Sequence, residues 1–68
     1  MEQDWTRIFS SDKPYQIEIA KALLEEAGIA TFQMDKKDSV YIFGEIELYV
    51  PKAEEYNGKL ILTEHDLL

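Results

Sequence analysis

The sequence contains no cysteine, and this absence excludes the covalent devices that stabilise many small domains. Without thiols the chain can form neither disulfide bonds nor thiolate metal sites. A chain of 68 residues also buries only about 60% of the surface that its unfolded state exposes, so its core is thin. We therefore expect one domain, residues 1–68, stabilised by helix–sheet packing, to which self-association would add.

Basic residues are scarce. Seven lysines and arginines stand against fourteen aspartates and glutamates, which gives a net charge of −7. Such a chain repels nucleic-acid phosphates and anionic membrane surfaces. Only Lys36 and Lys37 are adjacent, so no basic patch is available for phosphates. We expect no nucleic-acid partner, and the simplest interpretation of the acidity is solubility.

Long apolar runs are also absent. No stretch approaches the roughly 20 apolar residues of a membrane span. The first residues, M-E-Q-D-W-T-R, are acidic where a signal peptide needs a positively charged region. We therefore expect a cytoplasmic protein with no membrane partner, and the lack of cysteine is compatible with that compartment.

The sequence contains few residues of the types that form catalytic sites. A nucleophile needs a nearby base, and the only histidine, His65, lies close to the end of the sequence, where a solvated side chain is expected. Glu45 and Glu47 are two apart and could hold a divalent cation. Two carboxylates without a third ligand make a weak metal site, so we interpret them as solvated charges. We expect no enzyme activity, no cofactor and no metal.

The most regular feature of the sequence is an alternation over residues 40–50. Its even positions are aliphatic apart from one glycine, which is typical of a strand with one face in a core. The odd positions would be polar if they only met water, but three of the five are aromatic. Contiguous exposed aromatics indicate a contact surface, whereas cross-strand packing within the sheet is the alternative. The candidate protein-interaction residues are Tyr41, Phe43, Glu45, Glu47 and Tyr49.

Other segments show strand and helix patterns. Residues 5–10 and 29–35 are expected to be strands, and residues 15–27 a helix with an apolar stripe. Ser11 and Asp12 can cap that helix, and Gly28 suits a left-handed residue at its end. In the first strand Trp5, Arg7 and Phe9 would share one face. Trp5 is expected at the core margin, with a position on the open sheet face as the alternative.

Helical spacing recurs in residues 53–63 and predicts a second helix. Asn57-Gly58 is also a hairpin signal, so a turn followed by a strand remains the alternative. Residues 64–68 are expected to form a tail. The phases of all the elements predict a core that contains Ile17, Leu24, Phe32, Ile46, Leu48 and Val50.

The predicted order is strand, helix, strand, strand, helix. A right-handed crossover followed by a hairpin places the third strand between the other two, as a split βαβ unit. The predicted fold is α+β, βαββα and ferredoxin-like, with two helices on one face of a three-stranded antiparallel sheet. The other face stays open and carries Tyr41, Phe43 and Tyr49.

Several segments together carry a family resemblance: W-T-R-I-F-S, L-L-E-E-A-G-I, K-K-D-S and F-G-E-I-E-L-Y-V-P, followed by the last helix. Over nearly its whole length the chain resembles a small bacterial family of unknown function described as "putative signal-transducing proteins". Residues 24–29 and 43–51 are the most specific pieces. The resemblance implies a PII (GlnB)-like ferredoxin-like fold and a signalling role.

The sequence differs from PII itself in the loop between the second and third strands. PII proteins carry a long loop with a modified tyrosine that helps to bind nucleotide, whereas here the corresponding turn is only residues 36–39. No glycine-rich phosphate cradle is present either. The resemblance therefore implies a fold and supplies no set of catalytic residues.

Two function classes fit these observations. The first is a non-catalytic interaction or signalling module that binds a protein, or a second copy of itself as a homodimer, through the open sheet face or an edge strand. The alternative is a small-metabolite sensor with a PII-like fold. A metabolite would raise the melting temperature of a sensor, whereas an interaction module would respond only to its protein partner.

Overall fold

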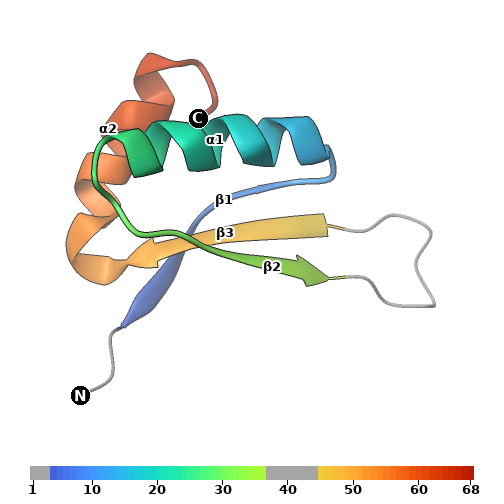
Figure 1. Cartoon of the computed structure of the whole chain (residues 1–68), viewed down its shortest axis with the longest axis horizontal. Helices are drawn as coiled ribbons and strands as arrows, with labels where there is room; N and C mark the ends of the chain where they lie inside the picture. The colour runs from blue at the N-terminus through green and yellow to red at the C-terminus, as the bar shows by residue number, and fades with distance from the viewer. Residues whose placement is uncertain (1–3, 37–44) are drawn as a thin grey trace.

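The structure is a computed structural model that describes residues 4–36 and 45–68, and it shows the expected order of elements. Two helices lie on one side of three strands, and the opposite sheet face has no helix over it (Figure 1). The elements are β1 (Trp5–Ser11), α1 (Pro14–Glu26), β2 (Phe32–Lys36), β3 (Glu45–Pro51), the 3-10 helix η1 (Lys52–Glu54) and α2 (Glu55–Glu64).

The sheet confirms the predicted topology. Its strands lie in the order β1-β3-β2, and both neighbouring pairs are antiparallel. The α+β arrangement is compatible with a ferredoxin-like fold. Neither of the helices found in the described parts of the chain has the length and apolar character needed to cross a membrane.

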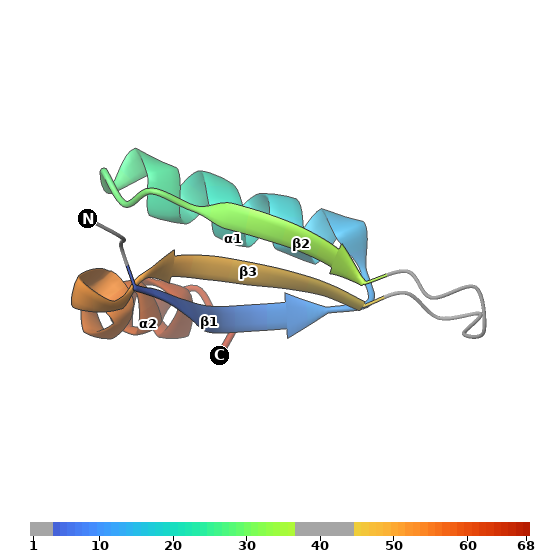
Figure 2. The same cartoon turned by 90° about the horizontal axis from the view of Figure 1, so that it is seen from below.

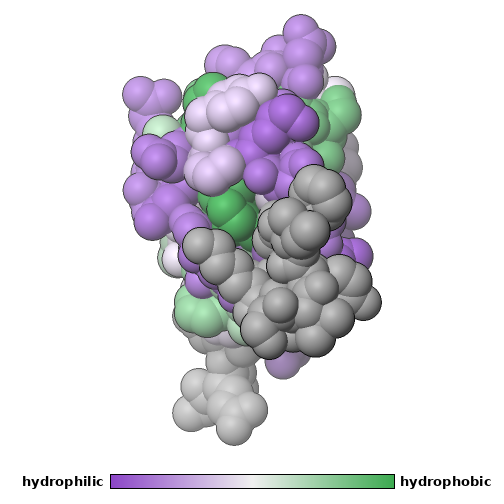
Figure 3. All heavy atoms as spheres, turned by 90° about the vertical axis from the view of Figure 1, so that its right-hand side faces the viewer, coloured by the Kyte–Doolittle hydropathy of each residue, from purple (hydrophilic) through white to green (hydrophobic). Residues whose placement is uncertain are grey.

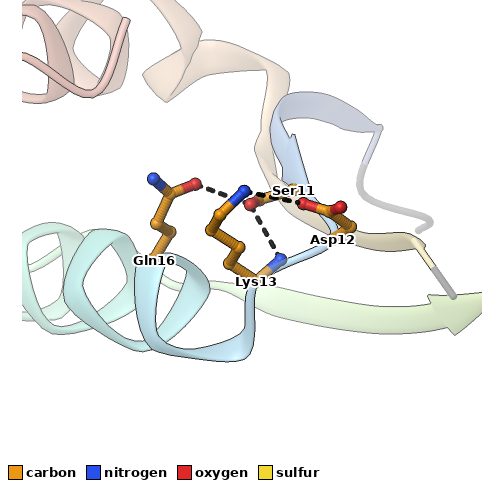
Figure 4. Close-up of polar contacts among 4 residues, drawn as sticks. All are labelled: Ser11, Asp12, Lys13 and Gln16. Carbon is orange, nitrogen blue, oxygen red and sulfur yellow. Dashed lines mark hydrogen bonds and ion pairs between the residues drawn. The ribbon is translucent and has the colours of Figure 1, made fainter. Parts of the chain in front are cut away.

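The start of α1 differs from the expected capping. Ser11 Oγ accepts a bond from the Lys13 N–H at 3.0 Å and donates to Gln16 Oε1 at 2.6 Å (Figure 4). Asp12 instead meets the ammonium group of Lys13. Lys13 is the N-cap residue and its side chain makes no capping bond, while Pro14 occupies the first turn, where its missing N–H costs nothing. Ser11 and Asp12 therefore form their bonds around the turn and do not cap the amides of the helix.

The end of α1 confirms the role of Gly28, whose φ is +84°. The Ile29 N–H donates to the Leu24 carbonyl at 3.0 Å, and the Gly28 N–H donates to the Glu25 carbonyl at 2.9 Å. These two bonds form a Schellman motif, which turns the chain sharply and packs Ile29 beside Leu24. Because Ile29 belongs to this motif, β2 starts at Phe32 and not at residue 29.

The core lies between the sheet and the two helices. Of the predicted core residues, Ile17, Leu24, Leu48 and Val50 are buried, and Ile46 is half-buried against them. Phe32 was wrongly assigned, because its register opposite Tyr49 places it on the open face. The buried apolar residues are Ile8, Phe9, Ile17, Ala20, Leu24, Ile29, Leu48, Val50 and Leu62.

A β-bulge in β1 changes the facing of its side chains. Arg7 lies opposite Tyr49 and Phe9 lies opposite Leu48, so Ile8 is an extra residue between two consecutive pairs. Trp5 and Arg7 therefore stay on the open side, while Ile8 and Phe9 are both buried. The expectation that Trp5, Arg7 and Phe9 share one face is wrong for this reason.

The second helix is continuous through Asn57 and Gly58, which excludes the hairpin alternative. Gly58 is buried because α2 approaches β1 closely there. A Cβ on Gly58 would overlap Ile8 Cδ1 and lie 3.3 Å from Leu24 Cδ2. Residues after α2 are not a free tail, since Leu67 packs against the core and its N–H donates to the Leu62 carbonyl.

Candidate interaction face

The open face is the side of the sheet that carries no helix (Figure 2). Strand register assigns side chains to it in rows across the three strands. One row contains Arg7, Tyr49 and Phe32, and the next contains Ser10, Glu47 and Met34. Among the residues whose side chains the structure describes, the large side chains of the open face include Trp5, Arg7, Phe32, Met34, Glu45, Glu47 and Tyr49.

Three aromatic rings form a continuous row on this face. The ring centroids of Trp5 and Phe32 are 6.1 Å apart, and those of Phe32 and Tyr49 are 6.2 Å apart, both in tilted geometry. These distances fall in the favourable range for aromatic pairs. Trp5 is 41% exposed and Phe32 48% exposed, so the row keeps much of its apolar surface in solvent. Trp5 thus takes the alternative position, on the open face.

The centre of the face holds a buried carboxylate. Glu47 is only 2% exposed, although no helix covers this side of the sheet. Arg7 Nη1 donates to its Oε2 at 2.8 Å, and the Tyr49 hydroxyl donates to its Oε1 at 2.7 Å. These charge-assisted bonds compensate the carboxylate for the water that it has lost.

The carboxylate changes the proton affinity of both donors. The hydrogen bond to Glu47, together with its negative charge, raises the pKa of Arg7 above its ordinary value. The pKa of Tyr49 is also raised, first by the hydrogen bond to Glu47, then by burial of the phenol and by the charge of Glu47. Both donors therefore keep their protons more firmly than they would in an unfolded chain.

The predicted interaction residues differ in how far the structure buries them. Glu45 is exposed, as a solvated charge should be, whereas Glu47 is buried and bonded, so its assignment as a solvated charge was wrong. Tyr49 is half-buried between Phe32 and Glu47. Tyr41 and Phe43 lie outside the described residues.

Sequence reasoning missed Phe32 and Met34 as members of the open face. Their side chains share one side of β2, and the apolar side of a strand was assumed to face the core. Because β2 is an edge strand, its helix-side positions are occupied by the polar Gln33 and Asp35 instead. The register against Glu47 and Tyr49 was the signal that could have corrected the facing.

The described residues show no metal centre. Within residues 4–36 and 45–68, no three histidine, cysteine, aspartate or glutamate side chains lie close enough together to hold an ion. The described part of the open face combines the aromatic row with the Arg7–Glu47 ion pair.

Comparison with known proteins identifies the family. No curated protein and no solved structure matches the chain. The model of the DUF2007 family, described as "Putative prokaryotic signal transducing protein", matches residues 5–66. This match spans almost the entire sequence and includes every strand and helix of the fold. The chain therefore belongs to the DUF2007 family.

Proposed function

We propose that this family member is a non-catalytic interaction module whose open face packs against the open face of a second copy. The observation that carries the proposal is the aromatic row of Trp5, Phe32 and Tyr49, which leaves two large apolar rings in solvent. Clustered apolar side chains on one face mark interaction surfaces, whereas scattered ones need no explanation. A second sheet about 10 Å away would cover the row and give each sheet two packed faces.

The distribution of charge supports a second copy as the occupant. Acidic side chains lie on the helix layer, at Glu18, Glu25 and Glu26 of α1 and at Glu55 and Glu64 of α2. Packing through the open faces keeps these acidic layers on the two outer surfaces of the dimer. Repulsion between chains of net charge −7 is then smallest for this orientation.

The Arg7–Glu47 pair reduces the charge repulsion expected between two open faces. A twofold axis through the sheet would bring Glu45 and Glu47 near their symmetry mates, and like charges repel. Arg7 and the Tyr49 hydroxyl already compensate Glu47, however, so Glu45 is the remaining acid of β3 on this face. Burial of the aromatic row should stabilise the dimer more than the repulsion between Glu45 and its symmetry mate destabilises it.

Sedimentation equilibrium tests the proposal. We expect a dimer in the micromolar range for the wild-type chain and a monomer for Phe32→Ser. Tyr56→Ser is the matched control, because Tyr56 is 73% exposed and belongs to α2 in the helix layer, and it should leave the dimer intact. Circular dichroism of each variant checks that the fold is retained.

A wild-type monomer at every concentration and salt condition would refute self-association. If such a monomer also melted at a higher temperature with one compound from a metabolite panel, the metabolite-sensor alternative would replace the proposal. Equal weakening of the dimer by Phe32→Ser and Tyr56→Ser would likewise exclude the open face as the interface.

A further inference from the structure

The second edge of the sheet has an unpaired backbone. Within residues 4–36 and 45–68, β2 pairs with β3 alone, so its other side presents free N–H and C=O groups. The edge strand β1 is interrupted by the bulge at Ile8, which distorts its ladder and discourages further pairing. In contrast, β2 has a regular register from Phe32 to Lys36 and contains no proline. It is the better template for an added strand.

A groove follows this edge. α1 runs along the β2 side of the sheet (Figure 2), and the space between them forms an open hollow of about 350 Å³. Ala22 and Lys21 line it from the helix, Gln33 from β2 and Ile46 from β3. The end view in Figure 3 shows mostly hydrophilic groups over the upper part of the molecule, with a small apolar surface between them.

We propose that the β2 edge and this groove bind an extended basic segment of a partner protein, which adds to the sheet as a fourth strand. An added strand lies about 4.8 Å from its neighbour and pairs with the free backbone groups. Its alternate side chains would point toward α1 and enter the groove. Strand addition of this kind gains affinity from the main chain and specificity from the groove.

The charges around the groove favour a basic segment. Glu18 and Glu25 line the groove from α1, and Asp35 lies on the helix side of β2. Among the described residues that line the groove, Lys21 is the one cation. The Glu25 carboxylate is fixed there by the Thr31 hydroxyl, which donates to it at 3.1 Å. An apolar side chain would meet Ala22 and Ile46, and basic side chains on either side of it would meet the carboxylates. The net charge of −7 also steers a cationic segment toward the protein.

The same charges argue against a second copy at this edge. Antiparallel pairing of two β2 strands would bring Asp35 and the glutamates of α1 close to their own counterparts. The β2 edge and the open face are therefore proposed to take different occupants.

Amide NMR spectra of the full chain with synthetic peptides test the site. The probe is an acetylated, amidated peptide of alternating lysine and valine, and the control probe replaces lysine by glutamate. We expect the basic peptide to shift the amides of Lys21, Ala22, Gln33 and Asp35, while the acidic peptide shifts none of them. Methylation of alternate backbone nitrogens on the basic peptide should weaken binding by at least about tenfold, because it removes the main-chain donors.

A pair of matched variants separates the groove from general charge attraction. Ala22→Trp fills the groove and should abolish binding, whereas Ala53→Trp alters an exposed alanine of η1 and should leave it unchanged. Binding that survives both Ala22→Trp and backbone methylation would overturn the proposal, and so would absence of binding at millimolar peptide. Dimerisation through β2 would show instead that a second copy is the occupant.

Discussion

Glu47 shows how one side chain can organise a face that no helix covers. Its two carboxylate oxygens have different partners, the guanidinium of Arg7 and the hydroxyl of Tyr49. Arg7 itself stays 57% exposed, so the ion pair joins a buried anion to a solvated cation. Because this pair compensates the charge of Glu47, the exposed aromatic rings are the part of the face that a partner would cover.

The ionisation of Tyr49 provides a test of this arrangement. Because its pKa is raised, the folded chain holds the phenol proton at pH values above 10, where the unfolded chain loses it. The contribution to stability is thus complete below pH 10 and is lost as the pH rises through the folded pKa. We expect Glu47→Gln to lower the pKa of Tyr49 relative to the wild type. The ring resonances of Tyr49 in NMR spectra recorded across the pH range measure this pKa.

Glu45→Gln is the control for this prediction, since Glu45 lies on the same face of β3 but is exposed. It should leave the titration of Tyr49 nearly unchanged. A Tyr49 titration that is identical in the wild type and in Glu47→Gln would contradict the assigned hydrogen bond.

The two helix ends offer a matched pair of stability tests. Gly28 and Asp66 both have positive φ, of 84° and 61°, and both follow the same bonding pattern at the end of a helix. Gly28→Ala should destabilise the fold by roughly 1 kcal/mol, because an L residue resists the left-handed conformation. Asp66→Gly should stabilise it by about 0.5 kcal/mol for the same reason.

Urea unfolding measures both changes. A Cβ on Gly28 would meet nothing within 4 Å, so steric overlap cannot account for the loss. Opposite signs for the two variants would confirm that conformation is the cause. A loss of stability in Asp66→Gly would mean that the aspartate side chain contributes more than its backbone costs.

At the scale of elements, the bulge in β1 and the glycine in α2 fit each other. The bulge directs Ile8 toward α2, and the absence of a side chain on Gly58 lets the helix approach it. Gly58 is normally a poor helix residue by about 1 kcal/mol relative to alanine. Its presence in α2 follows from packing, which outweighs the local preference.

We therefore predict that Gly58→Ala destabilises the fold despite the gain in helix propensity. The new methyl group would overlap Ile8 and crowd Leu24, and overpacking of a core costs about 1–3 kcal/mol. The net loss should be roughly 1 kcal/mol by urea unfolding. Combining the change with Ile8→Val, which removes the overlapping methyl group, should recover part of the loss. A simple gain in stability would show that α2 does not approach β1 so closely.

The sequence predicted the elements better than it predicted their faces. Periodicity located both helices and the strand order, because those depend on local pattern and on chain connectivity. The bulge at Ile8 and the outward facing of Phe32 depend on pairing between strands, which no single segment contains. Glu47 was placed on the correct side of the sheet, but its ion pair is with Arg7, which comes from another strand.

At the scale of the whole molecule, the two proposed surfaces should respond to salt in opposite ways. Two chains of net charge −7 repel each other, and salt screens that repulsion over a Debye length of about 8 Å at 0.15 M and about 3 Å at 1 M. Packing through the open faces should therefore strengthen as salt is added. Binding of a basic segment at the β2 edge depends on attraction and should weaken.

Trp5 reports the first effect directly, because it is the only tryptophan of the sequence and lies in the aromatic row. We expect its emission to shift to the blue with rising protein concentration, and the midpoint to fall to lower concentration at higher salt. In Phe32→Ser the emission should not depend on concentration, whereas Tyr56→Ser should behave as the wild type. If the midpoint rose with salt, the contact would be driven by opposite charges, and the apolar open face would not be its site.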